Sequence, residues 1–239
     1  MPTQPIHTLQ SKHFVVILTY TLAITLFAAL GIHAQQLQEG VSVKMAVTAN
    51  AQPMPAADDE DAWVVAITAD GRLYLGTKQF TANGLTEHMK LTPHRRDQNL
   101  YIKADARAPF ADVKKVLAAA KEDQFDALVL LTAQHEHVQP GTLVSPKGLE
   151  VLLTEPAMGS EAAVVQIRSA GKEMPALEVN HRPIAQEELQ ASLLALVQNR
   201  SEKFVLLKAD AQLPFSQLAW VIDICRAAGA KVILPTPEI

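Results

Sequence analysis

Lys103–Phe110 read KADARAPF and Lys208–Phe215 read KADAQLPF, so six of eight letters recur after an offset of 105 residues. The surroundings of the two phrases recur in pattern as well. A hairpin pattern, a helix pattern and an apolar strand precede each phrase, and a helix and a second apolar strand follow it. The sequence therefore predicts two units of the same kind within 239 residues.

The hairpin of the first unit is predicted from residues 63–80, where apolar and polar residues alternate on both sides of Asp70-Gly71. An Asp-Gly pair between alternating strands is the strongest short-range hairpin signal. Its counterpart is Ala163–Ile184, which has a longer turn containing glycine.

Each unit is also predicted to contain two helices. In the first unit Pro93 should end the earlier helix by Thr92, so that this helix is shorter than its counterpart. The apolar positions that predict the four helices are, in chain order, Leu85 and Met89; Val113, Val116, Leu117 and Ala120; Leu189, Leu193, Leu196 and Val197; and Leu218, Val221, Ile222 and Cys225.

Apolar strands flank the second helix of each unit. They are residues 99–105 and Ala127–Ala133 in the first unit, and residues 204–210 and Lys231–Pro237 in the second. A strand–helix–strand crossover makes a parallel pair beside the antiparallel hairpin. The predicted fold class is therefore α+β, with two similar domains that each consist of a small mixed sheet packed by two helices.

A further short strand is predicted before each hairpin, at Gly40–Val47 (GVSVKMAV) and at Gly148–Glu155 (GLEVLLTE). An isolated apolar strand would leave its backbone unpaired, so each must add to a sheet edge. We expect at least one of them to pair with the opposite unit, along its hairpin or its last strand. The acidic run Asp58–Asp61 is interpreted as part of a solvated tether.

A structural role explains most letters of the repeated phrase. The aspartates can accept hydrogen bonds from backbone N–H groups in the turn or at the helix start, the prolines suit a first helical turn, and the phenylalanines pack against the sheet. The lysines are not explained in this way. The alternative is a ligand-facing role, because lysine and aspartate lie at the carboxyl end of a strand. The residues concerned are Lys103, Asp105, Pro109, Phe110, Lys208, Asp210, Pro214 and Phe215.

Composition and motifs argue against catalysis and nucleic-acid binding. The net charge is −4, and the single cysteine, Cys225, excludes an internal disulfide. No serine lies in a nucleophile-elbow context, and no glycine-rich phosphate loop is present. His135 and His137 could share a metal if they lay on a strand, but without a further ligand cluster a solvated linker is favoured. We expect no enzyme activity and no cofactor.

The N-terminal region is predicted to direct export. Phe14–Ile32 has no charged residue over 19 positions, and as a helix it would be about 28 Å long, close to the roughly 30 Å hydrocarbon core of a bilayer. One interpretation is a single-pass anchor with a cytoplasmic N-terminus, supported by Lys12. The other is a signal peptide cut after Ala34. Either way, the rest of the chain is exported to the periplasm.

The order of these parts resembles the ExbD/TolR family of inner-membrane biopolymer transport proteins. A membrane helix, a strand beginning Gly-Val, a proline-rich tether and a small exported domain follow one another in that family. The residues that carry the resemblance are Gly40-Val41, Ile67, Asp70, Gly71, Leu73–Leu75, Asp105, Pro109 and Phe110, and again Gly148-Leu149, Asp210, Pro214, Phe215, Ala228 and Gly229.

The resemblance implies domains, partners and an activity. The expected segments are a cytoplasmic start (1–13), a membrane helix (14–32), a first periplasmic domain (40–133), a linker (134–147) and a second domain (148–239). Family members work as homodimers with an ExbB/TolQ-like membrane protein and a TonB/TolA-like protein, so a duplicated chain would form the dimer within one polypeptide. The alternative is an exported, non-catalytic module that reuses the fold to bind peptidoglycan or peptide.

One departure from the family pattern concerns energy coupling. The family's membrane helix carries an aspartate thought to bind protons, and proton relay needs an ionisable side chain inside the bilayer. Between Phe14 and Ile32 the polar side chains are those of Thr19, Tyr20, Thr21 and Thr25. Hydroxyl groups do not exchange protons at neutral pH in this way. The proton step is therefore not expected in this chain.

Overall fold

The computed structural model describes residues 40–95, 98–134, 144–153, 162–171, 174–198, 200 and 202–235. The predicted apolar helix Phe14–Ile32 and the His135–His137 motif lie outside these residues. Within the described part of the chain, no helix combines the length and apolar character needed to cross a bilayer.

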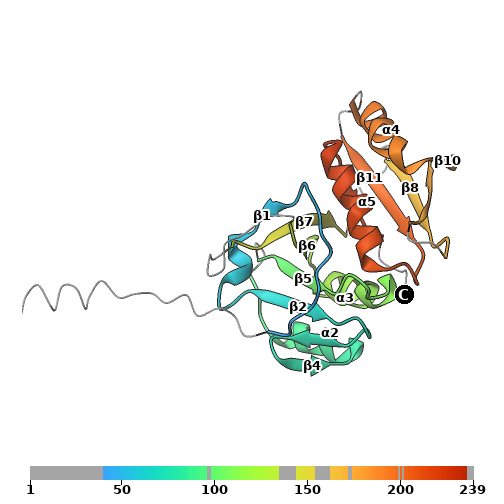
Figure 1. Cartoon of the computed structure of the whole chain (residues 1–239). Coiled ribbons are helices and arrows are strands. Elements are labelled where there is room, and N and C mark those ends of the chain that lie inside the picture. Colours follow the sequence, from blue (N-terminus) through green and yellow to red (C-terminus); the bar gives the residue numbers. More distant parts are fainter. Residues whose placement is uncertain are drawn as a thin grey trace, which may run out of the picture. The chain divides into compact units, whose positions relative to one another are not determined.

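The first half repeats the predicted order of hairpin, helix, strand, helix and strand (Figure 1). The predicted hairpin is a three-stranded meander, because a third strand follows the first two and pairs antiparallel with the second. The strand that follows the first helix pairs parallel with the first strand of the meander. The last strand pairs parallel with that same strand on its other side. The elements are β2 (Trp63–Ile67), β3 (Leu73–Leu75), β4 (Lys78–Phe80), α2 (Ala82–Leu91), β5 (Leu100–Ala104), α3 (Phe110–Glu122) and β6 (Ala127–Thr132).

The second half has the same element order and the same pairing. Its first three strands form an antiparallel meander. The first of them also pairs parallel with the strand that follows the first helix, and that strand pairs parallel with the last strand. The elements are β8 (Ala163–Arg168), β9 (Ala176–Val179), β10 (Arg182–Ile184), α4 (Gln186–Gln198), β11 (Phe204–Ala209), α5 (Phe215–Ala227) and β12 (Lys231–Ile233).

The helices form where the apolar spacing predicts them. In α2 the side chains of Leu85 and Met89 are fully buried, and the hydroxyl of Thr81 accepts a hydrogen bond from the Gly84 N–H at the helix start. Helix α2 ends at Leu91, just before Thr92 and Pro93, as expected, and it is shorter than α4. The predicted apolar positions of α3 and α5 are all buried.

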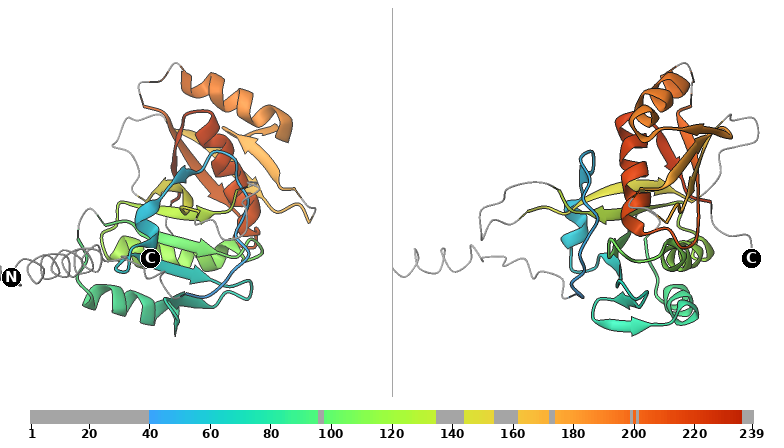
Figure 2. Two further views of the ribbon diagram at one scale, coloured as in Figure 1. Left: turned by 60° about the vertical axis from the view of Figure 1, so that its left-hand side comes forward. Right: turned by 45° about the vertical axis from the view of Figure 1, so that its right-hand side comes forward.

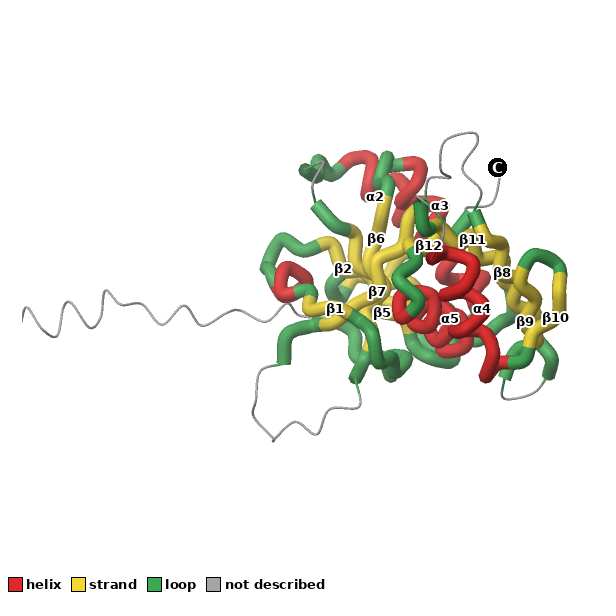
Figure 3. The backbone as a smooth tube through the Cα atoms, turned by 90° about the horizontal axis from the view of Figure 1, so that it is seen from above, coloured by secondary structure: helices red, strands yellow, loops and turns green. Residues whose placement is uncertain are grey.

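One strand joins the two halves into a single sheet. The strand predicted at Gly148–Glu155 is β7 (Lys147–Leu152), and it pairs antiparallel with β6 and parallel with β12. The order of the twelve-stranded sheet is β10-β9-β8-β11-β12-β7-β6-β5-β2-β3-β4, and the short β1 (Gln52–Pro53) pairs with β7 beside this path (Figure 3). The expected pairing of one such strand with the last strand of the opposite half is confirmed, and the two small sheets are one.

Gly148 allows the close approach of β7 to its neighbour. A Cβ atom built at this position would overlap the Cγ1 methyl of Val129 on β6. A larger residue here would force the Val129 side chain or the adjoining backbone of β6 to shift.

The strand predicted at Gly40–Val47 is wrong. Only two isolated bridges form, an antiparallel one between Met45 and Asp105 and a parallel one between Val47 and Ala133. Because the two bridges differ in direction and in partner, the segment cannot continue as one ladder. Residues 40–50, here called the strap, instead cross from the first half to the second (Figure 2).

The solvated tether predicted around Asp58–Asp61 also needs correction. The chain forms β1 and then a 3-10 turn, η1 (Pro55–Asp58). Ala57 of this turn is buried against the face of the sheet opposite α2 and α3, here called the second face. Within the acidic run, Asp58 is half-buried, and Asp59, Glu60 and Asp61 are exposed. The proline and alanine residues that suggest a flexible connector here supply a compact turn with a small apolar surface.

Candidate functional site

The two repeated phrases lie against each other. Pro109 and Pro214 face each other in an isolated antiparallel bridge, and four backbone hydrogen bonds surround it. Every bond has a counterpart 105 positions along the chain. The bonds run from Phe110 N to Leu213 O (2.8 Å), from Phe215 N to Ala108 O (2.8 Å), from Ala111 N to Ala211 O (2.7 Å) and from Ser216 N to Ala106 O (2.9 Å).

This reciprocal pairing satisfies the starts of two helices. The first N–H groups of a helix have no acceptor within the helix, and here the carbonyls of the opposite phrase accept from the first two of α3 and of α5. Pro109 and Pro214 occupy the N-cap positions with φ of −62° and −59°. Proline thus lies at each helix start, but as the N-cap residue and not in the first turn where it was expected.

The phenylalanines anchor the same contact. Phe110 and Phe215 are 2% and 0% exposed, and both belong to one apolar core that spans the two halves. Their expected packing in the core is confirmed. The phrases pair through backbone atoms, so no particular side chain in them predicts the contact. What indicates the contact in the sequence is that the phrase occurs twice.

The two aspartates play different parts. Asp105 is buried, and its carboxylate accepts from the backbone N–H groups of Arg107 (3.0 Å) and Lys44 (3.2 Å) and pairs with the Arg107 guanidinium (2.9 Å). Asp210 is exposed and accepts from Ser169 N (2.9 Å). Asp105 therefore caps a turn as predicted, but neither carboxylate serves the helix start, whose N–H groups bond to the opposite phrase.

The charge of Asp105 is strongly stabilised. The hydrogen bond from the Arg107 side chain, with smaller contributions from the backbone N–H groups of Arg107 and Lys44, lowers the pKa of Asp105 from 3.8 to about 2 despite the opposing effect of burial. The same pairing raises the pKa of the Arg107 guanidinium. Asp105 thus holds the strap at Lys44 through an ionised carboxylate.

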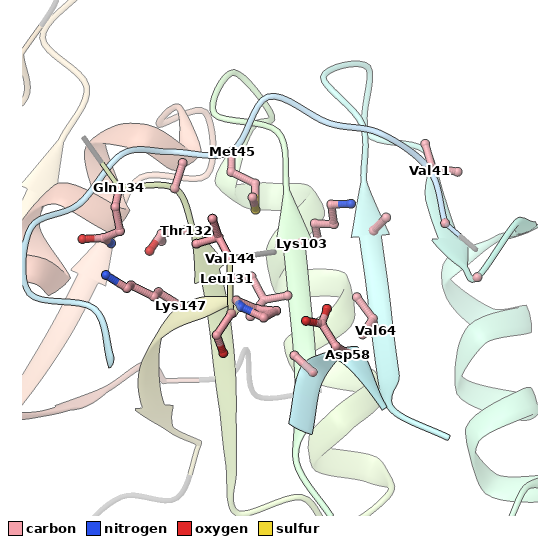
Figure 4. Close-up of a pocket in the computed structure, with 17 residues that line it drawn as sticks. Val41, Met45, Asp58, Val64, Lys103, Leu131, Thr132, Gln134, Val144 and Lys147 are labelled. Carbon is pink, nitrogen blue, oxygen red and sulfur yellow. The ribbon is translucent and has the colours of Figure 1, made fainter. Parts of the chain in front are cut away.

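The two lysines also differ. Lys103 is half-buried and lines a cavity of about 390 Å³, whereas Lys208 is exposed. The cavity lies on the second face of the sheet, opposite α2 and α3, under the strap (Figure 4). Strand alternation sends Val65 and Ile102 to the helices but Val64 and Lys103 to the cavity. Of the two lysines that the alternative interpretation of the phrase made ligand-facing, Lys103 lines this cavity and Lys208 does not.

The cavity wall is mostly apolar with a few charged groups. The apolar members include Met45 from the strap, Val64 and Ala66 from β2, and Leu131 from β6. Asp58 of η1 contributes a carboxylate whose pKa is raised by burial and by neighbouring Asp59, against the opposing effect of Lys103. Gln134, Val144 and Lys147 also line the cavity.

A second carboxylate, Asp223 of α5, holds the strap at the other half. It is 7% exposed and accepts from Ala49 N (3.0 Å), Asn50 N (2.8 Å) and Asn50 Nδ2 (3.1 Å). Sequence reasoning missed this residue, although it is the one acid within the apolar run of α5. Between the two carboxylates, the hydroxyls of Thr48 and Thr132 lie 2.7 Å apart and fix the strap to β6.

Metal and thiol chemistry find no support in the described residues. No group of three or more histidine, cysteine, aspartate or glutamate side chains suited to a metal ion occurs among them. Cys225 is buried in α5, and burial raises the pKa of its thiol to about 12, as befits an unreactive core residue.

Stability should depend on pH through Asp105. Because its pKa in the folded protein lies below the ordinary value, its contribution is complete above about pH 4 and is lost as the pH falls toward 2. In urea titrations between pH 2.5 and 6, Asp105→Asn and Arg107→Gln should both flatten the acid-side loss of stability. An unchanged slope in both variants would show that another group controls this region.

The Asp223 contact should determine how firmly the strap is held. Asp223→Asn replaces one acceptor oxygen by a donor group and leaves a strap N–H unsatisfied, which should cost about 1–3 kcal/mol. Asp210→Asn, on an exposed carboxylate, should stay within about 0.5 kcal/mol. Hydrogen exchange of the amides of residues 44–50 should accelerate in Asp223→Asn alone. Equal protection in both variants would contradict the assigned role.

Comparison with known proteins agrees with the order of these elements. Residues 17–135 match the family model described as Biopolymer transport protein ExbD/TolR. The chain matches no curated protein. The match contains the meander of the first half, α2, β5, the phrase KADARAPF, α3 and β6. This chain therefore belongs to the ExbD/TolR family.

Proposed function

We propose that the chain is a non-catalytic component of an inner-membrane biopolymer transport system, in which two ExbD-like periplasmic domains lie in tandem. The first domain would comprise residues 40–133 and the second residues 148–239, after a membrane helix at 14–32. The observation that carries the tandem arrangement is the reciprocal hydrogen bonding of Phe110 and Phe215 with the opposite phrase. Two-fold related bonds of this kind are typical of a symmetric dimer interface.

The arrangement amounts to an intramolecular pseudo-dimer. Family membership supports contacts with an ExbB/TolQ-like membrane protein and with a TonB/TolA-like protein. The β7 strand supports a fixed relation between the domains, because it pairs with β6 and with β12 at once. The proposed role is to present two joined domains to an envelope partner from one anchored chain.

Energy coupling would come from a partner in this proposal. The apolar stretch Phe14–Ile32 contains no carboxylate, whereas proton transfer through a membrane helix requires an ionisable side chain. The competing function, an exported module that binds peptidoglycan or peptide, rests on the cavity of the first domain and on a cleavable-looking sequence before Gln35. The two proposals differ in whether the N-terminal segment stays attached.

A cysteine pair tests the pseudo-dimer. Antiparallel bridge partners lie about 4.5–5.5 Å apart at Cα, within disulfide range. In the full-length protein, Pro109→Cys combined with Pro214→Cys should form an internal disulfide, seen as faster migration without reductant and restored by reduction. Each single variant should remain uncrosslinked. Disulfide-linked dimers from the single variants would instead show that the phrase pairs with a second chain.

A coupled assay tests the transport role. Full-length protein from the membrane fraction should retain its original N-terminus and co-purify with the ExbB/TolQ-like protein. It should not restore uptake in a strain that lacks its proton-coupled family member, because it has no membrane acid, whereas Thr25→Asp should restore part of it. Transport by the unaltered chain would contradict the uncoupled role, and a soluble chain cut after Ala34 would favour the binding module.

A further inference from the structure

The cavity beneath the strap combines an apolar wall with two lysines, Lys103 and Lys147. Val64, Leu131 and Met45 supply the apolar surface, and Lys103 extends from β5 into the same space (Figure 4). Its volume of about 390 Å³ lies within the range of about 300–1,000 Å³ typical of small-molecule sites. The site is thus large enough for a small ligand with an apolar body.

Lys103 has unused binding capacity. Among the residues that the structure describes, no carboxylate lies within ion-pairing distance of its ammonium group. The charge of Lys103 lowers the pKa of Asp58, but the two groups do not form an ion pair. Lys103 as a residue is half-buried, and an ammonium group gains from an anionic acceptor, since charge-assisted hydrogen bonds are stronger than neutral ones.

The repeat provides an internal comparison. Lys208 occupies the same position in its phrase but is exposed and does not line this cavity. Val164 likewise holds the position in β8 that Val64 holds in β2. A role in holding the phrase together would make the two lysines equivalent, whereas a ligand-binding role makes only Lys103 important.

We propose that this cavity is a binding site for a molecule that joins an apolar group to a carboxylate. The ammonium of Lys103 binds the carboxylate, and the apolar group lies against Val64 and Leu131. Met45 covers it from the strap, where its flexible thioether side chain can adapt to different shapes. Both a free arylalkanoic acid and the carboxyl end of a peptide present this chemistry.

Binding to the full-length protein in detergent tests the site by saturation-transfer NMR and titration calorimetry. The probes are 4-phenylbutyrate, its neutral isostere 4-phenylbutanamide, and N-acetylphenylalanine as a stand-in for a peptide carboxyl end. We expect 4-phenylbutyrate to bind at least tenfold more tightly than the amide, and more weakly as salt is raised. If N-acetylphenylalanine binds more tightly than 4-phenylbutyrate, the source is a peptide end, and the reverse order indicates a free acid.

Matched variants locate the binding. Lys103→Gln should weaken 4-phenylbutyrate at least tenfold, and Lys208→Gln should leave it unchanged. Val64→Trp should fill the cavity and abolish binding, whereas Val164→Trp should not. Asp58→Asn should leave affinity equal or increase it, because a like charge is removed.

Several results would overturn the proposal. They are the absence of binding by both acids, equal affinity for the amide, equal effects of the two lysine variants, or weaker binding in Asp58→Asn, which would indicate a ligand that also carries a cation. If the urea midpoint of Lys103→Gln equals that of the unaltered protein, its weaker binding results from the lost ligand contact and not from a damaged fold. The outcome does not depend on the transport assay, so each proposal can fail alone.

Discussion

The reciprocal hydrogen bonds between Ala106–Ala111 and Ala211–Ser216 are the constraint on which the arrangement of the two halves depends. Each phrase supplies the acceptors that the other phrase's helix lacks. Neither half can satisfy the first N–H groups of its second helix in this way without the other. An unsatisfied buried N–H group costs about 1–3 kcal/mol, so four bonds of this kind strongly favour one relative orientation.

A shared strand, β7, also connects the two halves. Since β7 pairs with both β6 and β12, the sheet has no edge where the halves meet, and among the described strands β4 and β10 lie at its two ends. The halves nevertheless differ in their second faces. The strap and η1 cover the second face of the first half, and a cavity remains beneath them. Similar folds thus give two unlike surfaces, as the contrast between Lys103 and Lys208 illustrates.

Periodicity predicted the fold well where local pattern decides structure. The four helices, the strands beside them, the ending of α2 near Pro93 and the strand at β7 all follow from apolar spacing and turn residues. The strap could not be predicted, because GVSVKMAV reads as a strand while its hydrogen-bond partners, Asp105, Ala133 and Asp223, are set by tertiary structure. The site was foreseen only in part. The phrase indicated Lys103 and Lys208 equally, and burial, which no short pattern encodes, distinguishes them.

The Asp223 contact also sets an order of assembly. Ala49 and Asp223 are separated by 174 positions. The strap is among the first described residues to be synthesised, but this partner lies near the end of the chain. Contacts of such long sequence separation form late, because the intervening chain must be ordered first. The first half can complete its meander and helices early and can hold the strap at Lys44 and Thr48, but the strap's attachment at Ala49 and Asn50 forms only when α5 has formed. A chain truncated before α5 would therefore keep the strap contacts within the first half and lose the attachment of the strap to the second half.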